Sequence, residues 1–191
     1  MVLVCMMMVS CDGKHEGHGY VDLGLSVKWA TCNVGATSPE DYGHYFAWGE
    51  TSPMDEYTDD NCSTYGKQMG DIAGDAQYDA ATANWGGDWR MPTEAEMQEL
   101  LNNCTWEWIN TNGVNGYKVT GPSGASIFLP AAGCRYGSSL DHAGSYGRYW
   151  SSTPSVSNDD NAYDLFFFSD GLIMGDRGYR NIGLSVRPVV E

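Results

Sequence analysis

The stretch Thr93-Glu94-Ala95-Glu96-Met97-Gln98-Glu99-Leu100-Leu101-Asn102-Asn103-Cys104 decides the fold class. Thr93 and Glu96 have the spacing of a capping box, in which each side chain accepts a hydrogen bond from the other residue's backbone amide. Met97 and Leu100 follow at helical spacing, which gives the segment one apolar face. We therefore predict a helix over roughly Glu94–Asn103 that packs against the core.

The chain before this helix begins with a β pattern and continues as a long connection. Apolar and polar residues alternate from Val21 to Trp29, which is the signature of a strand with one buried face. Ser38–Asp41 has an N-cap residue followed by Pro, so we predict a short helix there that ends at Gly43. Thr51–Asn84 shows little periodicity and is predicted to be a long loop over the core.

From Gly116 onward the sequence predicts short β-strands. Tyr117–Val119 and Ser126–Leu129 flank the turn Gly121–Gly124, the pattern of a hairpin. Further short strands are predicted over residues 148–152, 162–168, 172–174 and 184–189. One or two helices among many short strands give an α+β fold class, with short mixed or antiparallel sheets and long ordered loops.

The composition indicates one globular domain that does not bind nucleic acid. A chain of 191 residues is long enough for one full-sized core and short for two. Its 24 glycines and its 18% of charged residues predict many turns and few exposed helices. The net charge of −15 argues against a nucleic-acid partner, because phosphate backbones bind clustered Lys and Arg.

The first residues suggest a lipid-anchored protein. Met1–Cys11 is apolar and too short to span a bilayer, but it suits the apolar region of a signal peptide. Met8-Val9-Ser10-Cys11 resembles a bacterial lipobox, which implies acylation of Cys11. We expect a signal remnant and polar tether over residues 1–19 and a single domain over residues 20–191, with membrane contact only through the lipid. A buried N-terminal strand is the alternative.

Four cysteines remain if Cys11 carries a lipid and Cys5 is removed with the signal. They are Cys32, Cys62, Cys104 and Cys134. An even number of cysteines in an oxidising compartment fits two disulfides with three possible pairings, and free buried thiols are the alternative. No C-x-x-C motif occurs, which argues against a zinc ribbon.

Motifs of common catalytic sites are missing from the sequence. It contains no G-x-S-x-G elbow and no glycine-rich phosphate loop. Ser138, Asp141 and His142 are close in sequence, but a catalytic triad is defined by its geometry in space. His15–His18 lies in the expected tether, and Asp159–Asn161 lacks an EF-hand pattern. We therefore expect no enzymatic activity, no metal and no cofactor.

Six motifs occur in order between Tyr20 and the end of the chain. They are YVDLGLSVKWATCNVG (20–35), YFAWGE (45–50), WRMPT (89–93), FLPAAG (128–133), YWSS (149–152) and SVRPV (185–189). Together they resemble the bacterial major-paralogous-domain family, the Fibrobacter-type paralogous domain. The resemblance implies a C-type-lectin-like fold, similar to the variable proteins of diversity-generating retroelements and to the formylglycine-generating enzymes.

Each of these relatives implies a different function for the C-terminal segment. In the variable proteins this segment carries diversified residues and binds a partner, and it corresponds here to residues 146–184. The oxidising enzymes use paired cysteines near the C-terminus, whereas Cys134 is the only cysteine after Cys104. The calcium-binding triplets of animal lectins, Glu-Pro-Asn and Gln-Pro-Asp, are absent from the sequence.

The composition of residues 146–181 independently indicates a binding surface. This segment mixes Tyr, Phe, Ser, Asn, Asp and Gly, as antibody paratopes do. Within 163–168, the period-two rule places Tyr163, Leu165 and Phe167 on one face and Asp164, Phe166 and Phe168 on the other. We assign the Asp164 face to the surface, because Asp is unusual in a core; two buried faces with Asp164 at an edge are the alternative.

We therefore predict a non-catalytic, receptor- or adhesin-like lipoprotein domain on the outer membrane, facing the cell surface, that binds an unknown protein or glycan. The expected binding residues are Tyr146, Arg148, Asn158, Asp160, Asn161, Asp164, Phe166, Phe168, Asp170, Tyr179, Arg180 and Asn181. Trp150, Arg90 and Arg187 are assigned to the scaffold. A degenerate relative of the oxidising enzymes and a structural subunit of a surface appendage are the alternative functions.

Overall fold

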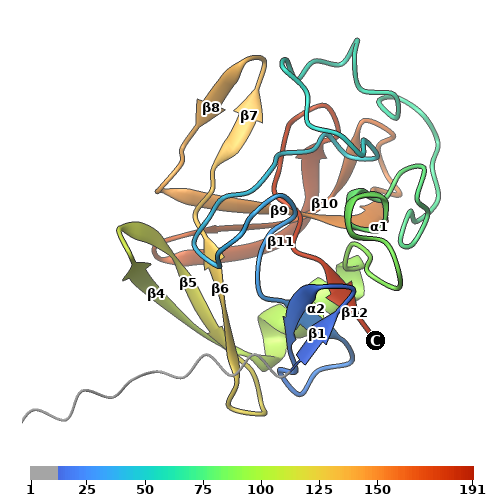
Figure 1. The fold of residues 1–191 in the computed structure, drawn as a ribbon. Coiled ribbons are helices and arrows are strands. Elements are labelled where there is room, and N and C mark those ends of the chain that lie inside the picture. The colour runs from blue at the N-terminus through green and yellow to red at the C-terminus, as the bar shows by residue number, and fades with distance from the viewer. Residues whose placement is uncertain (1–12) are drawn as a thin grey trace, which may run out of the picture.

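The protein has a mixed α+β fold that is mainly β (Figure 1). The computed structural model describes residues 13–191, apart from the side chains of residues 176 and 177. The elements are β1 (Gly13–His15), β2 (His18–Val21), β3 (Lys28–Ala30), α1 (Ala80–Trp85), α2 (Glu94–Asn103), β4 (Thr105–Thr111), β5 (Val114–Thr120), β6 (Ser126–Pro130), β7 (Cys134–Tyr136), β8 (Ser139–Asp141), β9 (Tyr146–Pro154), β10 (Asn161–Phe168), β11 (Gly171–Tyr179) and β12 (Val189–Val190).

The strands of the described chain form small antiparallel sheets. Their orders are β1-β2-β3-β12, β11-β10-β9, β4-β5-β6 and β7-β8. The predicted hairpin is confirmed as β5 and β6, whereas β4 was not expected. The long loop is also confirmed up to Asp79, which caps α1 by accepting hydrogen bonds from the backbone amides of Ala81 and Thr82.

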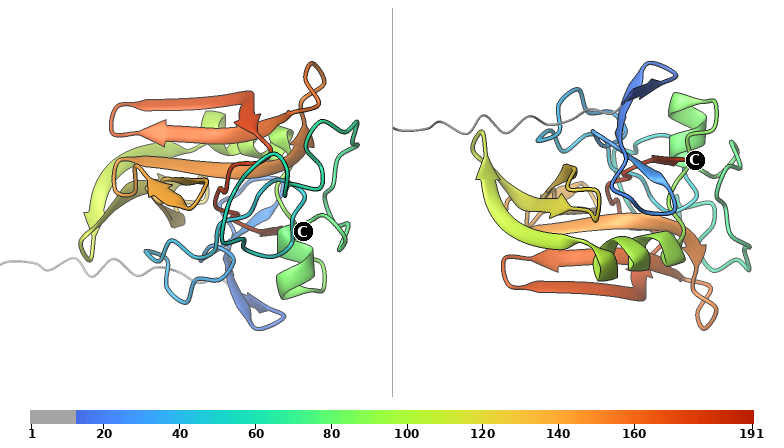
Figure 2. Two further views of the ribbon diagram at one scale, coloured as in Figure 1. Left: turned by 90° about the horizontal axis from the view of Figure 1, so that it is seen from above. Right: turned by 90° about the horizontal axis from the view of Figure 1, so that it is seen from below.

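The predicted helix is confirmed as α2, with both hydrogen bonds of its capping box. Figure 2 shows α2 running along one side of the sheet β9-β10-β11. Met97 and Leu100 are fully buried there and belong to the same apolar cluster as Tyr149, Leu165 and Phe167. This face of the sheet is therefore part of the hydrophobic core.

Large buried side chains fill the space between the sheets and the long loops. Trp150 is fully buried and donates from Nε1 to the carbonyl of Phe46 at 2.8 Å. Arg187 is also fully buried, and its guanidinium donates to the side chain of Asn33 and to backbone carbonyls, including that of Phe128. Both residues belong to the scaffold, as predicted.

The predicted strand from Val21 to Trp29 is wrong, because the chain turns within it. β2 ends at Val21 and β3 begins at Lys28. The side chain of Asp22 accepts a hydrogen bond from the amide of Gly24 at 2.8 Å, and Gly24 has a φ of 76°. This left-handed conformation, which glycine adopts easily, ends the extended pairing that the alternating pattern suggested.

The expected tether is part of the folded domain from Gly13 onward. β1 and β2 form a hairpin over residues 13–21. The His18 ring stacks on Trp85 at a centroid distance of 3.8 Å, and Trp89 donates from Nε1 to the carbonyl of His15. The domain therefore begins before Tyr20. Cys5, Cys11 and the apolar run Met1–Cys11 lie outside the described residues.

Two smaller predictions also differ from the structure. Residues 38–41 form a turn and not a helix, because Asp41 accepts hydrogen bonds from the amides of Thr37 and Ser38 and closes the loop locally. The predicted strand 184–189 is reduced to β12, since Leu184 and Ser185 make only isolated bridges to Phe46 and Tyr149. No helix in residues 13–191 has the length and apolar character needed to cross a membrane.

Candidate functional site

The sheet β9-β10-β11 separates a buried face from a face that is partly open. Leu165 and Phe167 of β10 point into the core, whereas Phe166 and Phe168 lie on the opposite face and are half-buried. At one end of this outer face, loop residues around Phe46 and Leu184 cover Trp150. The other end carries no such cover among the described residues and forms the candidate site.

An aromatic cluster occupies the open end of the outer face. Phe168 is paired with Tyr146 across the strands, and Phe166 is paired with Arg148 on β9 and Ile173 on β11. The Tyr146 ring lies 5.4 Å from Phe166 and 6.4 Å from Phe168 in edge-to-face contacts, and the two Phe rings lie 5.7 Å apart. These geometries stabilise aromatic pairs and hold the rings in place.

An ion pair lies at the inner edge of the cluster. Arg148 donates from Nε to the Asp164 carboxylate at 2.8 Å, and its guanidinium lies 5.8 Å from the centre of the Phe166 ring. Burial raises the pKa of Asp164, although Arg148 and the amide of Gly178 oppose the shift. The pair places two charged groups beside a mainly aromatic cluster.

A pocket of about 470 Å³ opens beside this cluster. Its walls include Tyr146, Arg148, Asp164, Phe166 and Ile173, together with two side chains from the β7-β8 region, Cys134 and His142. The His142 ring packs on Tyr146 at 4.5 Å, and Ile173 is 50% exposed. We call the cluster and its pocket the aromatic surface.

The structure brings five of the predicted binding residues together and places the others elsewhere. Tyr146, Arg148, Asp164, Phe166 and Phe168 form the aromatic surface. The remaining seven predicted residues lie outside the pocket, in three loops and at the strand ends beside them. Asn158, Asp160 and Asn161 lie at the start of β10, Asp170 lies in the β10-β11 turn, and Tyr179, Arg180 and Asn181 lie at and after the end of β11.

Arg180 is a correction, because it is fully buried and not a surface contact. Its guanidinium donates to the backbone carbonyls of Thr64, Lys67 and Asn161 at 2.7–3.0 Å and lies 4.5 Å from the centre of the Trp48 ring. Arg180 therefore ties the long loop to the end of β11. Its neighbour Tyr179 is 54% exposed, as predicted.

Asp164 is the second correction, because only 3% of it is exposed. Phe166 and Phe168 are partly exposed, as the outward assignment predicted. Asp164 is not, because the Arg148 side chain covers it. Asp164 nevertheless lies on the same face as Phe166 and Phe168, because the register from Asp164 to Phe168 is unbroken and the register shift precedes Asp164. The face was therefore predicted correctly, and Asp164 is buried because it lies at the covered end of that face, opposite Trp150 and against Arg148.

The cysteines of the described chain are free thiols, so the expectation of two disulfides is wrong and the alternative of free thiols is right. Burial raises the pKa of Cys134, and Arg148 only partly opposes this shift. A reactive thiol needs the opposite change, since the thiolate is the nucleophile. In residues 13–191, no group of three or more His, Cys, Asp or Glu side chains is placed to hold a metal ion.

Sequence reasoning missed His142 and Ile173 as members of the site. Residues 172–174 were recognised as a strand, and a turn at Ser169–Gly171 would pair Ile173 with Phe166. The pairing of Ile173 with Phe166 could therefore have been predicted from the sequence. The position of His142 was not, because it depends on how the β7-β8 hairpin packs beside β9.

No protein-family profile, curated protein or solved structure matches this chain.

Proposed function

We propose that this chain is a non-catalytic, extracytoplasmic binding protein whose partner contacts the aromatic surface. The observation that carries the proposal is a cluster of half-buried rings, with Ile173 50% exposed beside it, around a pocket of about 470 Å³. Contiguous apolar patches on soluble proteins often mark interaction sites. Aromatic and Arg side chains in such patches supply most of the binding energy.

The chemistry of the aromatic surface favours a protein partner over a glycan. Sugar hydroxyls require hydrogen-bond partners, but the Asp164 carboxylate already accepts from Arg148 and is only 3% exposed. Phe166, Phe168 and Ile173 offer only hydrocarbon contacts. An apolar side chain of a partner protein would contact these three residues, and Arg148, Tyr146 and His142 would bond to polar groups around it.

A binding experiment with matched variants tests this proposal. The purified chain would be offered to a displayed peptide library and to a glycan array, and the affinity of each ligand found would be measured for the parent, Phe166→Ser and Ile173→Ser. Val156→Ser is the control, because Val156 is 93% exposed and lies outside the pocket.

We expect peptide ligands whose affinity falls about thirtyfold or more in the two site variants. Val156→Ser should leave affinity unchanged, and thermal melts should show that all variants are folded. Ligands that bind the site variants as tightly as the parent would contradict the proposal. Glycans as the only ligands would contradict the choice of a protein partner.

We also propose that the domain is C-type-lectin-like and resembles the variable binding proteins. The sequence motifs that carry the resemblance supply main parts of the scaffold: Trp48, Trp89, Trp150 and Arg187 are all fully buried. Such residues are the ones that a shared scaffold would keep. Small antiparallel sheets joined by long irregular loops are compatible with this fold.

The oxidase alternative is disfavoured by the thiol chemistry. That activity needs a reactive cysteine, whereas burial raises the pKa of Cys134, and no second cysteine lines its pocket. Labelling of the native chain with a thiol reagent at neutral pH tests this ranking. Modification of Cys134 faster than that of a free cysteine would favour the oxidase.

The lipid anchor at Cys11 remains a separate proposal, based on the lipobox resemblance. Expression of the chain in a bacterium with labelled fatty acid should give a labelled protein. Cys11→Ala should abolish the label, while Cys5→Ala should retain it. A label that survives Cys11→Ala would contradict the anchor without affecting the proposal for the aromatic surface.

A further inference from the structure

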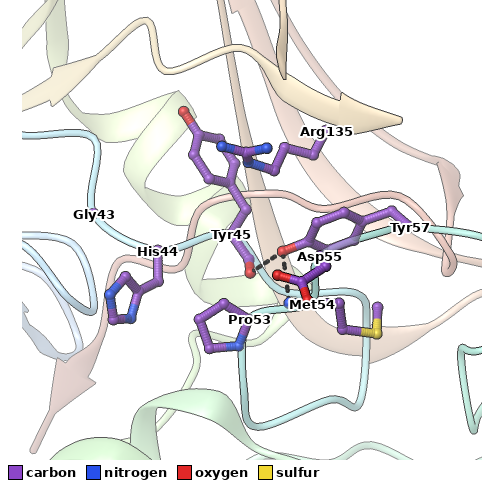
Figure 3. A pocket seen from close by; sticks show the side chains of 8 residues that line it. All are labelled: Gly43, His44, Tyr45, Pro53, Met54, Asp55, Tyr57 and Arg135. Carbon is purple, nitrogen blue, oxygen red and sulfur yellow. Dashed lines mark hydrogen bonds between the residues drawn. The ribbon is translucent and has the colours of Figure 1, made fainter. Parts of the chain in front are cut away.

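Strand β7 borders a second pocket that lies apart from the aromatic surface. Cys134 lines the aromatic pocket, while the next residue, Arg135, lines a pocket of about 270 Å³ (Figure 3). Neighbouring side chains of a strand point to opposite faces, so the two pockets share a strand but no lining residue.

The Arg135 backbone is fixed by hydrogen bonds, and its guanidinium packs on an aromatic ring. The Arg135 backbone exchanges hydrogen bonds with Gly183 at 2.8 and 2.9 Å, and its guanidinium lies 5.3 Å from the centre of the Tyr45 ring. The Tyr45 hydroxyl donates to the carbonyl of Ala132 at 2.6 Å. Tyr57 donates to the carbonyl of Tyr45, also at 2.6 Å (Figure 3). The ring against which Arg135 packs is therefore itself fixed.

Arg135 differs from the other arginines whose side chains are described. Arg90 and Arg148 pair with carboxylates, and Arg180 and Arg187 donate to backbone carbonyls. In residues 13–191, no hydrogen bond or ion pair engages the guanidinium of Arg135. Its five N–H donors are available in a fork that matches the geometry of a carboxylate.

The other side chains that line the pocket restrict which class of ligand Arg135 could bind there. Asp55 and His44 line it with Arg135, and no ion pair joins Asp55 to Arg135. A simple anion would be repelled by the carboxylate of Asp55, whereas a ligand with hydroxyl or amide donors can also bond to it. The volume of about 270 Å³ is several times the roughly 30 Å³ of one water, so the pocket has room for a small organic molecule and not only for an ion.

We propose that this pocket binds a small carboxylate that also carries hydrogen-bond donors, with Arg135 as the partner of the ligand's carboxylate. A sugar acid and an acylated amino acid, such as the end of a peptide, share this chemistry. The site is independent of the function proposed for the aromatic surface.

Titration of the purified chain with four probes tests the proposal. D-glucuronate and N-acetylglycine present a carboxylate with donors, D-glucose lacks the carboxylate, and acetate lacks the donors. Binding would be followed by calorimetry and by NMR chemical shifts at low ionic strength. Arg135→Gln removes the charge, Arg135→Lys retains it without the fork, and Lys67→Gln removes the charge of an exposed lysine elsewhere.

We expect D-glucuronate or N-acetylglycine to bind, and acetate and D-glucose to bind more weakly. The tighter of the two carboxylates shows whether the ligand is a sugar acid or an acylated amino acid. Arg135→Gln should weaken binding by about tenfold or more, Arg135→Lys by less, and Lys67→Gln by less than about twofold. The proposal would be overturned if neither carboxylate bound the parent at up to about 10 mM, if D-glucose bound equally well, or if a folded Arg135→Gln variant bound as the parent does.

Discussion

Replacement of Arg180 by Ala should destabilise the fold strongly, although Arg180 lies in a segment rich in typical binding residues. The change removes hydrogen bonds to the carbonyls of Thr64, Lys67 and Asn161, and it removes the contact with the ring of Trp48. Each buried acceptor left without a donor costs about 1–3 kcal/mol, and a desolvated cation–π contact contributes about 1–2 kcal/mol. Water that enters the vacated space recovers part of this loss.

We therefore expect a loss of roughly 3–5 kcal/mol, the range found when one partner of a buried charged network is removed. This is a large fraction of the roughly 5–15 kcal/mol by which domains are stable. Urea unfolding at neutral pH, followed by tryptophan fluorescence, measures the difference. Arg135→Ala is the matched control, since no hydrogen bond engages its guanidinium in the described chain, and it should cost about 1 kcal/mol or less. An Arg180→Ala variant within about 1 kcal/mol of the parent would refute the structural role of Arg180.

Three further predictions concern the scaffold. Trp150→Ala should cost about 3–5 kcal/mol in the same urea assay, because it empties a fully buried site, while an unchanged midpoint would show that Trp150 is not core. Thr93→Ala should cost about 1 kcal/mol through loss of the α2 cap, whereas Thr111→Ala, in a strand, leaves the cap intact and serves as the control. Burial raises the pKa of Glu96, but hydrogen bonds from Arg90 and Thr93 outweigh it and hold the pKa below the ordinary 4.5. This stabilisation is present above pH 4.5 and is lost as the pH falls through the folded-state pKa, so acid should destabilise the parent more steeply than Glu96→Gln, and parallel stability curves would contradict the assignment.

Local signals in the sequence predicted the elements whose stabilising contacts are also local. The α2 helix has its cap and its apolar face within twelve residues, and the hairpin of β5 and β6 has its turn between its strands. The turn at Gly24 was missed because alternation of apolar residues does not record φ. The hairpin of β1 and β2 was missed because its stabilising contacts, Trp85 and Trp89, come from far along the chain.

The candidate site was predicted only in part, because some of its residues depend on local contacts and others on distant ones. The composition of 146–181 correctly located Tyr146, Phe166 and Phe168 on a partly open face, since alternation within β9 and β10 is local. Asp164 and Arg180 were misplaced because their burial depends on distant partners. The partner of Asp164 is Arg148 on the neighbouring strand β9, and the partners of Arg180 include carbonyls more than a hundred residues earlier.

The position of β12 has a consequence for how the protein is made. Val189 and Val190 complete the sheet that begins with β1, where they pair with β3, and Val189 also bridges to Arg90. During synthesis the N-terminal hairpin emerges from the ribosome long before these two valines, so the edge of β3 stays unpaired until they arrive. Because native pairings between such distant segments form slowly, the nascent chain must pass through an interval with Trp29 and its strand edge uncovered. This sheet can be completed only after residue 190 has left the ribosome.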